Sequence, residues 1–137
     1  MISAVIITKN EEKMLPDCLK SLSWVDEIVV IDTGNTDSTN EIARKHKAKV
    51  VKYDGPANFS GWRNRGLTEA AGEWILYIDA DERIPEELKN EIQRIIVETN
   101  LSAFSIPRRN NLLGHNMKHG GWWPDRPVSL ALAVWRE

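Results

Sequence analysis

The feature that most constrains this chain is a fourfold alternation of short apolar runs with segments of helical pattern. The apolar runs are dense in valine and isoleucine and cover residues 2–8, 26–32, 48–53 and 73–79. Such runs are typical of strands that are covered on both faces. Repeated strand–helix units of this kind predict a Rossmann-like α/β fold, in which helices flank a mainly parallel sheet.

Start and stop signals predict a helix after each strand. The first helix should start or kink at Pro16, the second should open with a capping box of Ser38 and Glu41, and the fourth should start at Pro85. The third should end at Gly72. The apolar positions expected to face the sheet are Met14, Leu15, Cys18, Leu19 and Leu22, then Phe59, Trp62, Leu67 and Ala70, and finally Leu88, Ile92, Ile95 and Ile96.

Polar residues follow all four predicted strands. They are Thr8 to Glu11, Asp32 to Asp37, Asp54 with Gly55, and the acids Asp79, Asp81 and Glu82. Each loop alone is consistent with ordinary turns and helix caps. Because parallel sheets bind ligands at the carboxyl ends of their strands, the four loops together predict a functional site at that edge.

The acids in "DADE" form the densest cluster of charge in the sequence. Asp79, Asp81 and Glu82 would repel one another unless a cation, a proton or a set of amide donors compensates them. The alternative is that the two aspartates end a strand and prepare the helix at Pro85.

Composition narrows the classes of function. The 137 residues are 42% hydrophobic and 28% charged with a net charge of −2, which indicates one soluble domain and argues against a nucleic-acid footprint. The single cysteine, Cys18, excludes an internal disulfide framework and suits a reducing compartment. The apolar run at the N-terminus follows no basic segment and is far shorter than the ~20 residues of a membrane span, so we expect a cytoplasmic protein.

Four motifs in order resemble the family 2 glycosyltransferases, which have the A-type nucleotide-sugar-binding fold. They are "VIITKNEE" (5–12), "VDEIVVIDTGNTDST" (25–39), "WRNRGL" (62–67) and "WILYIDADER" (74–83). Bacterial lipopolysaccharide core and related cell-surface sugar transferases look most similar, because "GGWWPD" (120–125) also has a counterpart there. The resemblance covers residues 2 to about 126. It implies a single domain over residues 1–137, located in the cytoplasm or at the inner face of the cell membrane.

The resemblance implies a metal-dependent, inverting transfer of a sugar from a nucleotide sugar, with UDP favoured, to a cell-envelope glycan or glycolipid. Asp79 and Asp81 match the D-x-D motif, with Asp81 on the metal and Asp79 near the ribose or metal-bound water. Hard oxygen ligands suit Mg²⁺ or Mn²⁺, which neutralise a nucleoside diphosphate leaving group. Glu82 is expected to be a helix-terminus acid.

The family match assigns further residues to the nucleotide sugar. They are Thr8 and Glu11 for the base and ribose, Asp32 for the base, Asp37, and Arg63 with Asn64 for the sugar or diphosphate. Asp37 could instead cap a helix. Asn35 stands where serine is more usual, a change that preserves polarity.

The acceptor side is expected to be incomplete. Asp125 is the candidate catalytic base, and Trp122 with Trp123 could offer a flat surface to a sugar ring. Family members usually continue much further, and "RPVSLALAVWRE" departs from the usual continuation. We therefore expect the acceptor-binding part, at about residues 101–137, to be incomplete because the chain is truncated or altered by a frameshift. An uncovered sheet face could then drive self-association.

Rival classes fit the motifs less well. A haloacid-dehalogenase-like phosphotransferase needs its D-x-D after the first strand and Thr or Val where Arg83 stands. A sugar-phosphate nucleotidyltransferase needs a glycine-rich loop after the first strand, and "TKNEEK" has no glycine. The alternative that remains is a nucleotide-binding half-domain without transferase activity on its own.

Overall fold

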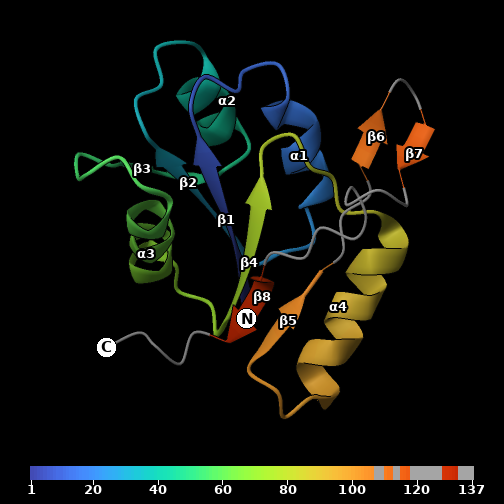
Figure 1. Ribbon diagram of the computed structural model, residues 1–137. Helices are drawn as coiled ribbons and strands as arrows, with labels where there is room; N and C mark the ends of the chain where they lie inside the picture. Colours follow the sequence, from blue (N-terminus) through green and yellow to red (C-terminus); the bar gives the residue numbers. More distant parts are fainter. Residues whose placement is uncertain (107–109, 113–114, 118–127, 133–137) are drawn as a thin grey trace.

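A computed structural model of the chain describes residues 1–106, 110–112, 115–117 and 128–132 (Figure 1). Strands and helices alternate through the first hundred residues. The elements are β1 (Ile2–Thr8), α1 (Leu15–Ser21), β2 (Glu27–Asp32), α2 (Thr39–Lys45), β3 (Lys49–Lys52), α3 (Phe59–Glu69), β4 (Trp74–Asp79), α4 (Glu86–Glu98), β5 (Ala103–Ser105), β6 (Asn110–Leu112), β7 (His115–Met117) and β8 (Val128–Leu132).

The main sheet has six strands in the order β3-β2-β1-β4-β8-β5. The pairs β3–β2, β2–β1 and β1–β4 are parallel, whereas β4–β8 and β8–β5 are antiparallel. The strands β6 and β7 form a separate antiparallel pair. The predicted α/β fold with a mainly parallel sheet flanked by helices is therefore confirmed.

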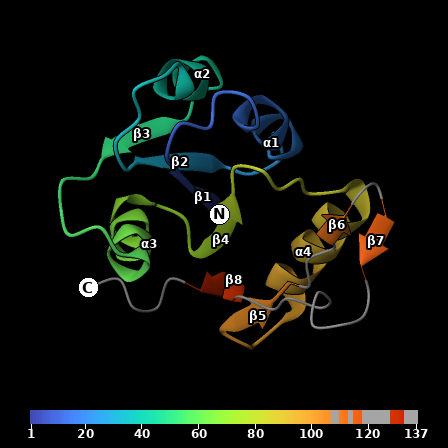
Figure 2. The same cartoon turned by 45° about the horizontal axis from the view of Figure 1, so that its top comes forward.

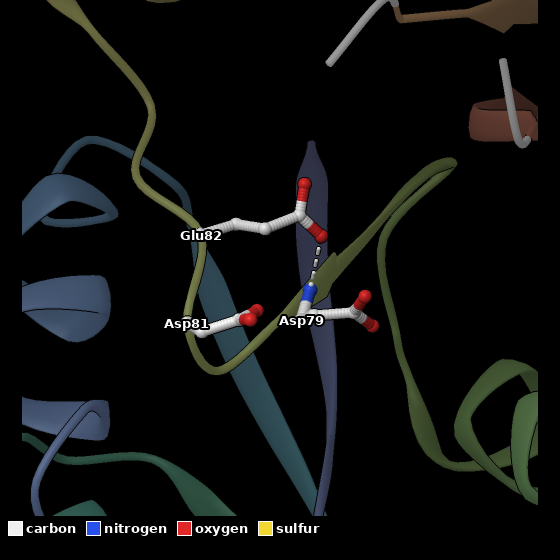
Figure 3. Close-up of side chains that lie close together, drawn as sticks. All are labelled: Asp79, Asp81 and Glu82. Atoms are coloured by element: carbon white, nitrogen blue, oxygen red, sulfur yellow. Dashed lines mark hydrogen bonds between the residues drawn. The ribbon is translucent and has the colours of Figure 1, made fainter. Parts of the chain in front are cut away.

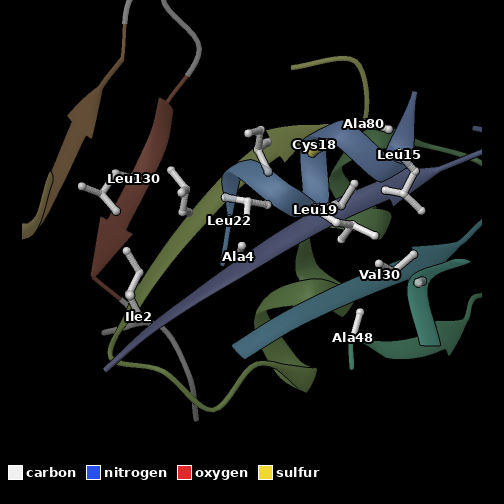
Figure 4. Close-up of a cluster of buried hydrophobic side chains, with 14 of the residues drawn as sticks. Ile2, Ala4, Leu15, Cys18, Leu19, Leu22, Val30, Ala48, Ala80 and Leu130 are labelled. Carbon is white, nitrogen blue, oxygen red and sulfur yellow. The ribbon is translucent and has the colours of Figure 1, made fainter. Parts of the chain in front are cut away.

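Helices cover the two faces of the sheet unequally (Figure 2). Buried side chains of α1, α2 and α4 pack on one face, around Ala4 and Ile6 of β1. Figure 4 shows Cys18 and Leu19 of α1 in this cluster with Ala4. The opposite face carries α3, which packs on Val5, Val29 and neighbouring residues. Because successive residues of a strand point to opposite faces, β1 supplies side chains to both clusters and lies at the centre of the molecule.

Two strands of the main sheet were missed by the sequence analysis. β8 pairs with the edge of β4, and Leu130 is only 1% exposed within the larger core cluster. The pairing joins segments that are more than fifty residues apart, which no local pattern reveals. The alternation of Val128, Leu130 and Leu132 was nevertheless an available signal for a strand.

Three expectations for the helices were wrong. Ser38 occupies the N-cap position of α2, but its side chain makes no capping hydrogen bond, so the capping box does not form. Helix α3 ends at Glu69 instead of Gly72, because Ala70 is extended and the Gly72 N–H turns to the Ser3 hydroxyl at 2.9 Å. Phe59 and Met14, both expected to face the sheet, are 53% and 41% exposed at the starts of α3 and α1.

Cys18 is a buried core residue, as expected. Burial raises the pKa of its thiol to about 12, so the thiol stays protonated at neutral pH.

Candidate functional site

Three parallel strands end together at one edge of the sheet. Thr8 at the end of β1 is the register partner of Asp32 at the end of β2, and Ile7 is the partner of Asp79 at the end of β4. The register therefore brings the predicted site residues of three loops to one place. Open parallel sheets bind their ligands at this edge, where the carboxyl ends of the strands lie.

The loops after β1 and β2 are joined by a row of hydrogen bonds between side chains and backbone. From the first loop, Lys9 Nζ donates to the Gly34 carbonyl at 3.0 Å, the Asn10 N–H to Asn35 Oδ1 at 2.8 Å and the Glu11 N–H to Thr39 Oγ1 at 2.8 Å. From the second loop, the Thr36 N–H donates to Asn10 Oδ1 at 2.7 Å and the Ser38 N–H to Glu12 Oε2 at 3.1 Å. Asn10 has a φ of 55° and Gly34 a φ of 126°, backbone angles that asparagine and glycine tolerate best. The two loops thus form one ordered unit.

Asn35 lies at the centre of this unit. Its side-chain amide donates to Thr8 Oγ1 at 2.8 Å and to Asn40 Oδ1 at 2.9 Å, while its own oxygen accepts from Asn10. Thr8 is fully buried, and its hydroxyl donates in turn to the Ile31 carbonyl at 3.1 Å. Asn35 was noted only as a polarity-preserving change, but a serine is too short to bridge all these partners.

Asp32 is buried below this unit and accepts three hydrogen bonds. Its Oδ1 accepts from the N–H groups of Gly34 at 2.8 Å and Asn35 at 2.6 Å, and its Oδ2 accepts from the Asn40 amide at 2.8 Å. Burial acts to raise the pKa of Asp32, but the bonds from Asn35, Asn40 and Gly34, with a smaller effect of Lys52, lower it overall. The carboxylate is therefore ionised and shapes its own loop.

Asp37 caps helix α2. Its carboxylate accepts from the Thr39 N–H at 2.9 Å and from the Thr39 hydroxyl, and its second oxygen accepts from the Glu12 N–H at 3.3 Å. Thr39 is fully buried and ties the cap to the first loop. Sequence analysis missed Thr39, whose signal was its place directly after an Asp-Ser pair at a helix start.

The acids of the "DADE" segment converge at the end of β4. One carboxylate oxygen each of Asp79, Asp81 and Glu82 lies within 4.8 Å of the other two. In Figure 3 the side chains of Asp81 and Glu82 reach back from the loop toward Asp79. Glu82 Oε1 accepts from the Asp79 N–H at 2.8 Å, and the Glu82 N–H donates to the Asp79 carbonyl at 2.9 Å. Glu82 belongs to this turn, so its assignment as a helix-terminus acid was wrong: α4 begins only at Glu86.

This group of acids fits a divalent cation. Ligands on opposite sides of an Mg²⁺ ion, each at ~2.1 Å, are ~4.2 Å apart, so small side-chain movements would bring the three oxygens into range. Glu11, from the first loop, lies in the same negative environment. Burial, followed by repulsion from Asp81, Asp37 and Asp79, raises the pKa of Glu11. Burial and the negative charge at this edge thus act on the Glu11 carboxyl group in the same direction.

Arg63 of α3 lies near Asp79, in a hollow that both residues line. Its guanidinium carbon is 4.3 Å from the ring centroid of Tyr77 and 5.2 Å from that of Phe59, so two aromatic rings hold the group. Arg63 and Asp79 line the same hollow, together with Val5, Ile7, Phe59, Tyr77 and Ile78. Asn64 is exposed on α3. The structure therefore places Arg63 beside the acids.

Asp125, the predicted base, lies outside the described residues, as do Trp122 and Trp123. None of the helices in the described part of the chain combines the length and the apolar character that a membrane crossing needs.

Comparison with known proteins identifies the family. Residues 3–135 match the profile described as "Glycosyl transferase family 2". The chain is 38% identical over 115 residues to an uncharacterized glycosyltransferase of Rickettsia conorii, covering 83% of this chain and 40% of that protein. It is 29% identical over 119 residues to the lipopolysaccharide core biosynthesis glycosyltransferase LpsC of Rhizobium meliloti, covering 83% of this chain and 44% of LpsC.

A solved structure shares the fold. Glucosyl-3-phosphoglycerate synthase from Mycobacterium tuberculosis, in complex with Mn²⁺, UDP and glucosyl-3-phosphoglycerate, superposes with a TM-score of 0.55 at 26% identity, covering 61% of this chain and 35% of that one. The chain thus spans less than half the length of each of these three proteins. The profile match, the relatives and the shared fold agree, and the chain belongs to glycosyl transferase family 2.

Proposed function

We propose that this chain is the donor-binding domain of a metal-dependent, inverting glycosyltransferase that uses a UDP-sugar. The observation that carries the proposal is the meeting of three carboxylates with the joined loops of β1 and β2 at one edge of the sheet. Family membership supplies the reaction class. The synthase with the same fold is described in complex with Mn²⁺ and UDP, which supports the choice of ligand.

The proposed donor site divides into two parts. The loops of β1 and β2 would hold the nucleoside, with Thr8, Glu11, Asp32 and Asp37 shaping or lining the pocket. On the other side, Arg63 and Asn64 would bind the diphosphate or the sugar, because a guanidinium matches the geometry of phosphate oxygens. The aromatic rings around Arg63 hold its guanidinium in place before a ligand arrives, which reduces the entropy lost on binding.

Asp81 and Asp79 would hold Mg²⁺ or Mn²⁺ between these two parts, with Glu82 as a further acid of the same turn. The ion would neutralise the nucleoside diphosphate as it leaves. The carboxylates of this chain also repel a bare diphosphate, so we expect donor binding to need the cation.

The acceptor in this proposal is a cell-envelope glycan or glycolipid, as the name of the similar lipopolysaccharide core glycosyltransferase LpsC suggests. An inverting transfer needs a base that removes the proton of the acceptor hydroxyl, and Asp125 is the proposed base. Cytoplasmic donor and membrane-bound acceptor would meet at the inner face of the cell membrane. The acceptor-binding part is expected within residues of about 101–137 and in the additional length that the relatives have.

The test is a calorimetric titration of UDP into the protein with Mn²⁺ and with a chelator. We expect Mn²⁺ to increase the affinity for UDP at least tenfold, and Asp81→Asn to remove that increase without unfolding the protein. Glu73→Gln is the matched control, because it makes the same kind of change at the opposite end of β4. Equal affinity for UDP with and without Mn²⁺ would contradict the proposed metal role.

A transfer assay tests the rest of the proposal. A radiolabelled UDP-sugar and a bacterial envelope extract would be incubated with the chain and with an extended version of it. Label transferred in an Asp125-dependent manner would support the assigned base, whereas equal transfer by Asp125→Asn would exclude it.

A further inference from the structure

Helix α1 contacts both ends of the loop that carries the acids. Ser21, the last residue of α1, accepts a hydrogen bond from the Ile84 N–H at 3.1 Å and donates one to the Cys18 carbonyl at 2.8 Å. A hydroxyl has only one hydrogen, so the bond to Cys18 fixes its direction and leaves a lone pair for Ile84. At the other end of the loop, the buried Cys18 thiol faces the Asp79 carbonyl at 3.6 Å.

Arg83 adds a third connection between the loop and α1. Its guanidinium donates to the Ala80 carbonyl at 3.3 Å and to the Glu82 carbonyl at 2.8 Å. The same group lies 3.8 Å from the Asp17 carboxylate on α1. The guanidinium thus binds the backbone of the loop whose three carboxylates lie within 4.8 Å of one another.

These contacts oppose the repulsion between the acids. Three carboxylates within 4.8 Å of one another tend to separate when no cation is present, by rotation of their side chains and by movement of the backbone of residues 79–84 that carries them. Ser21 and Arg83 restrain that backbone movement, because they bind the Ile84 N–H and the carbonyls of Ala80 and Glu82. In metal sites such supporting groups set the affinity by keeping the ligands in place.

We propose that Ser21 and Arg83 are positioning residues that preform the acidic turn for its divalent cation. The inference rests on the proposed function, in which Asp79 and Asp81 hold the metal. It adds that the affinity for the cation is set partly from α1, a helix that contributes no ligand.

The experiment measures Mn²⁺ binding to the full chain without nucleotide, from the free Mn²⁺ signal in electron paramagnetic resonance. Ser21→Ala is expected to weaken Mn²⁺ binding roughly tenfold, as is typical of supporting groups in metal sites. Ser21→Thr keeps the hydroxyl and should stay close to wild type. Arg83→Lys keeps the charge but has a single nitrogen, which cannot bind the two carbonyls and face Asp17 at the same time as the two terminal nitrogens of arginine do, and it should also weaken Mn²⁺ binding.

Two controls separate positioning from general damage. Ser23→Ala changes an exposed serine just beyond α1 and should leave Mn²⁺ binding unchanged. Uridine carries no phosphate, so its affinity should stay the same in Ser21→Ala and Arg83→Lys if only the acidic turn is disturbed. Loss of uridine binding in parallel with Mn²⁺ would overturn the proposal, and so would wild-type Mn²⁺ affinity in both variants. A wild-type protein that binds no Mn²⁺ would refute the proposed function and this inference together.

Discussion

Asp32 shows how one side chain can serve both a ligand and the loop that surrounds it. The family resemblance assigns Asp32 to the base of the nucleotide, whereas the structure shows its oxygens accepting from Gly34, Asn35 and Asn40. A carboxylate offers about four lone-pair sites, so three bonds leave room for one more donor. The two roles are compatible, and they predict that a change at Asp32 affects stability and base binding together.

We expect Asp32→Ala to lower the free energy of unfolding by ~1–3 kcal/mol at pH 7, because three donors lose a buried charged acceptor. The pKa of Asp32 is lowered in the folded protein, so its stabilising effect is present above the ordinary value of 3.8 and is lost as the pH falls through the folded-state value. The difference from wild type in urea unfolding should therefore shrink in acid.

The exposed Asp54→Ala is the control and should change stability by less than ~0.5 kcal/mol. Asp32→Ala should also weaken the binding of uridine. If uridine and UDP each bound to this variant as tightly as to the wild type, Asp32 would only order the loop before α2. The assignment of Asp32 to the base pocket would then lose its support.

At the scale of elements, the sequence predicts what local pattern encodes. The four apolar runs became β1 to β4 within a residue or two of the expected bounds. The buried parallel strands β1, β2 and β4 leave a continuous apolar signal, whereas β3 is an edge strand with a weaker one. The bonds that join the first two loops were not predicted, because Asn10 and Asn35 are 25 residues apart and neither carries a sign of its partner. Glu82 was misassigned for a related reason, since its carboxylate turns back to the Asp79 N–H instead of forward to α4.

The contact between α3 and β1 gives a prediction at the same scale. Gly66 is buried on α3, and a Cβ at this position would collide with the Val5 side chain of β1. Alanine has the better helix propensity by ~1 kcal/mol, but overpacking a rigid core costs ~1–3 kcal/mol, so the collision should win. We expect Gly66→Ala to lower the melting temperature.

The double variant Val5→Ala/Gly66→Ala tests the cause. Removing the Val5 methyl groups makes room for the new Cβ. Val5→Ala should therefore lower the free energy of unfolding less in the Gly66→Ala background than in the wild type, and a double-mutant cycle measures this difference. A Gly66→Ala protein that is more stable than wild type would show that α3 can move away from the sheet at little cost.

At the scale of the molecule, the two edges of the parallel sheet differ in kind. The amino edge is closed by its own side chains: the Ser3 hydroxyl donates to Glu27 Oε2 at 2.6 Å and accepts from the Gly72 N–H, while Glu27 also accepts from the Ala71 N–H at 2.8 Å. The carboxyl edge carries the three acids, and the charges of Asp79 and Asp81 are among the causes that raise the pKa of Glu11. A ligand that brings positive charge, or a metal with a diphosphate, should therefore act on the carboxyl edge alone.

Amide hydrogen exchange can test this asymmetry across the whole sheet. Adding UDP with Mn²⁺ should slow exchange in residues 9–12, 34–38 and 80–84, because a ligand that binds only the ordered loops suppresses their local opening. Residues 71–73 at the amino edge serve as the internal control and should not change. The amides of β1 should exchange slowest with or without ligand, since β1 is paired on both sides and covered on both faces. Slowing at 71–73 with no change at 80–84, at saturating UDP and Mn²⁺, would place the ligand at the wrong edge and refute the donor site proposed for this chain.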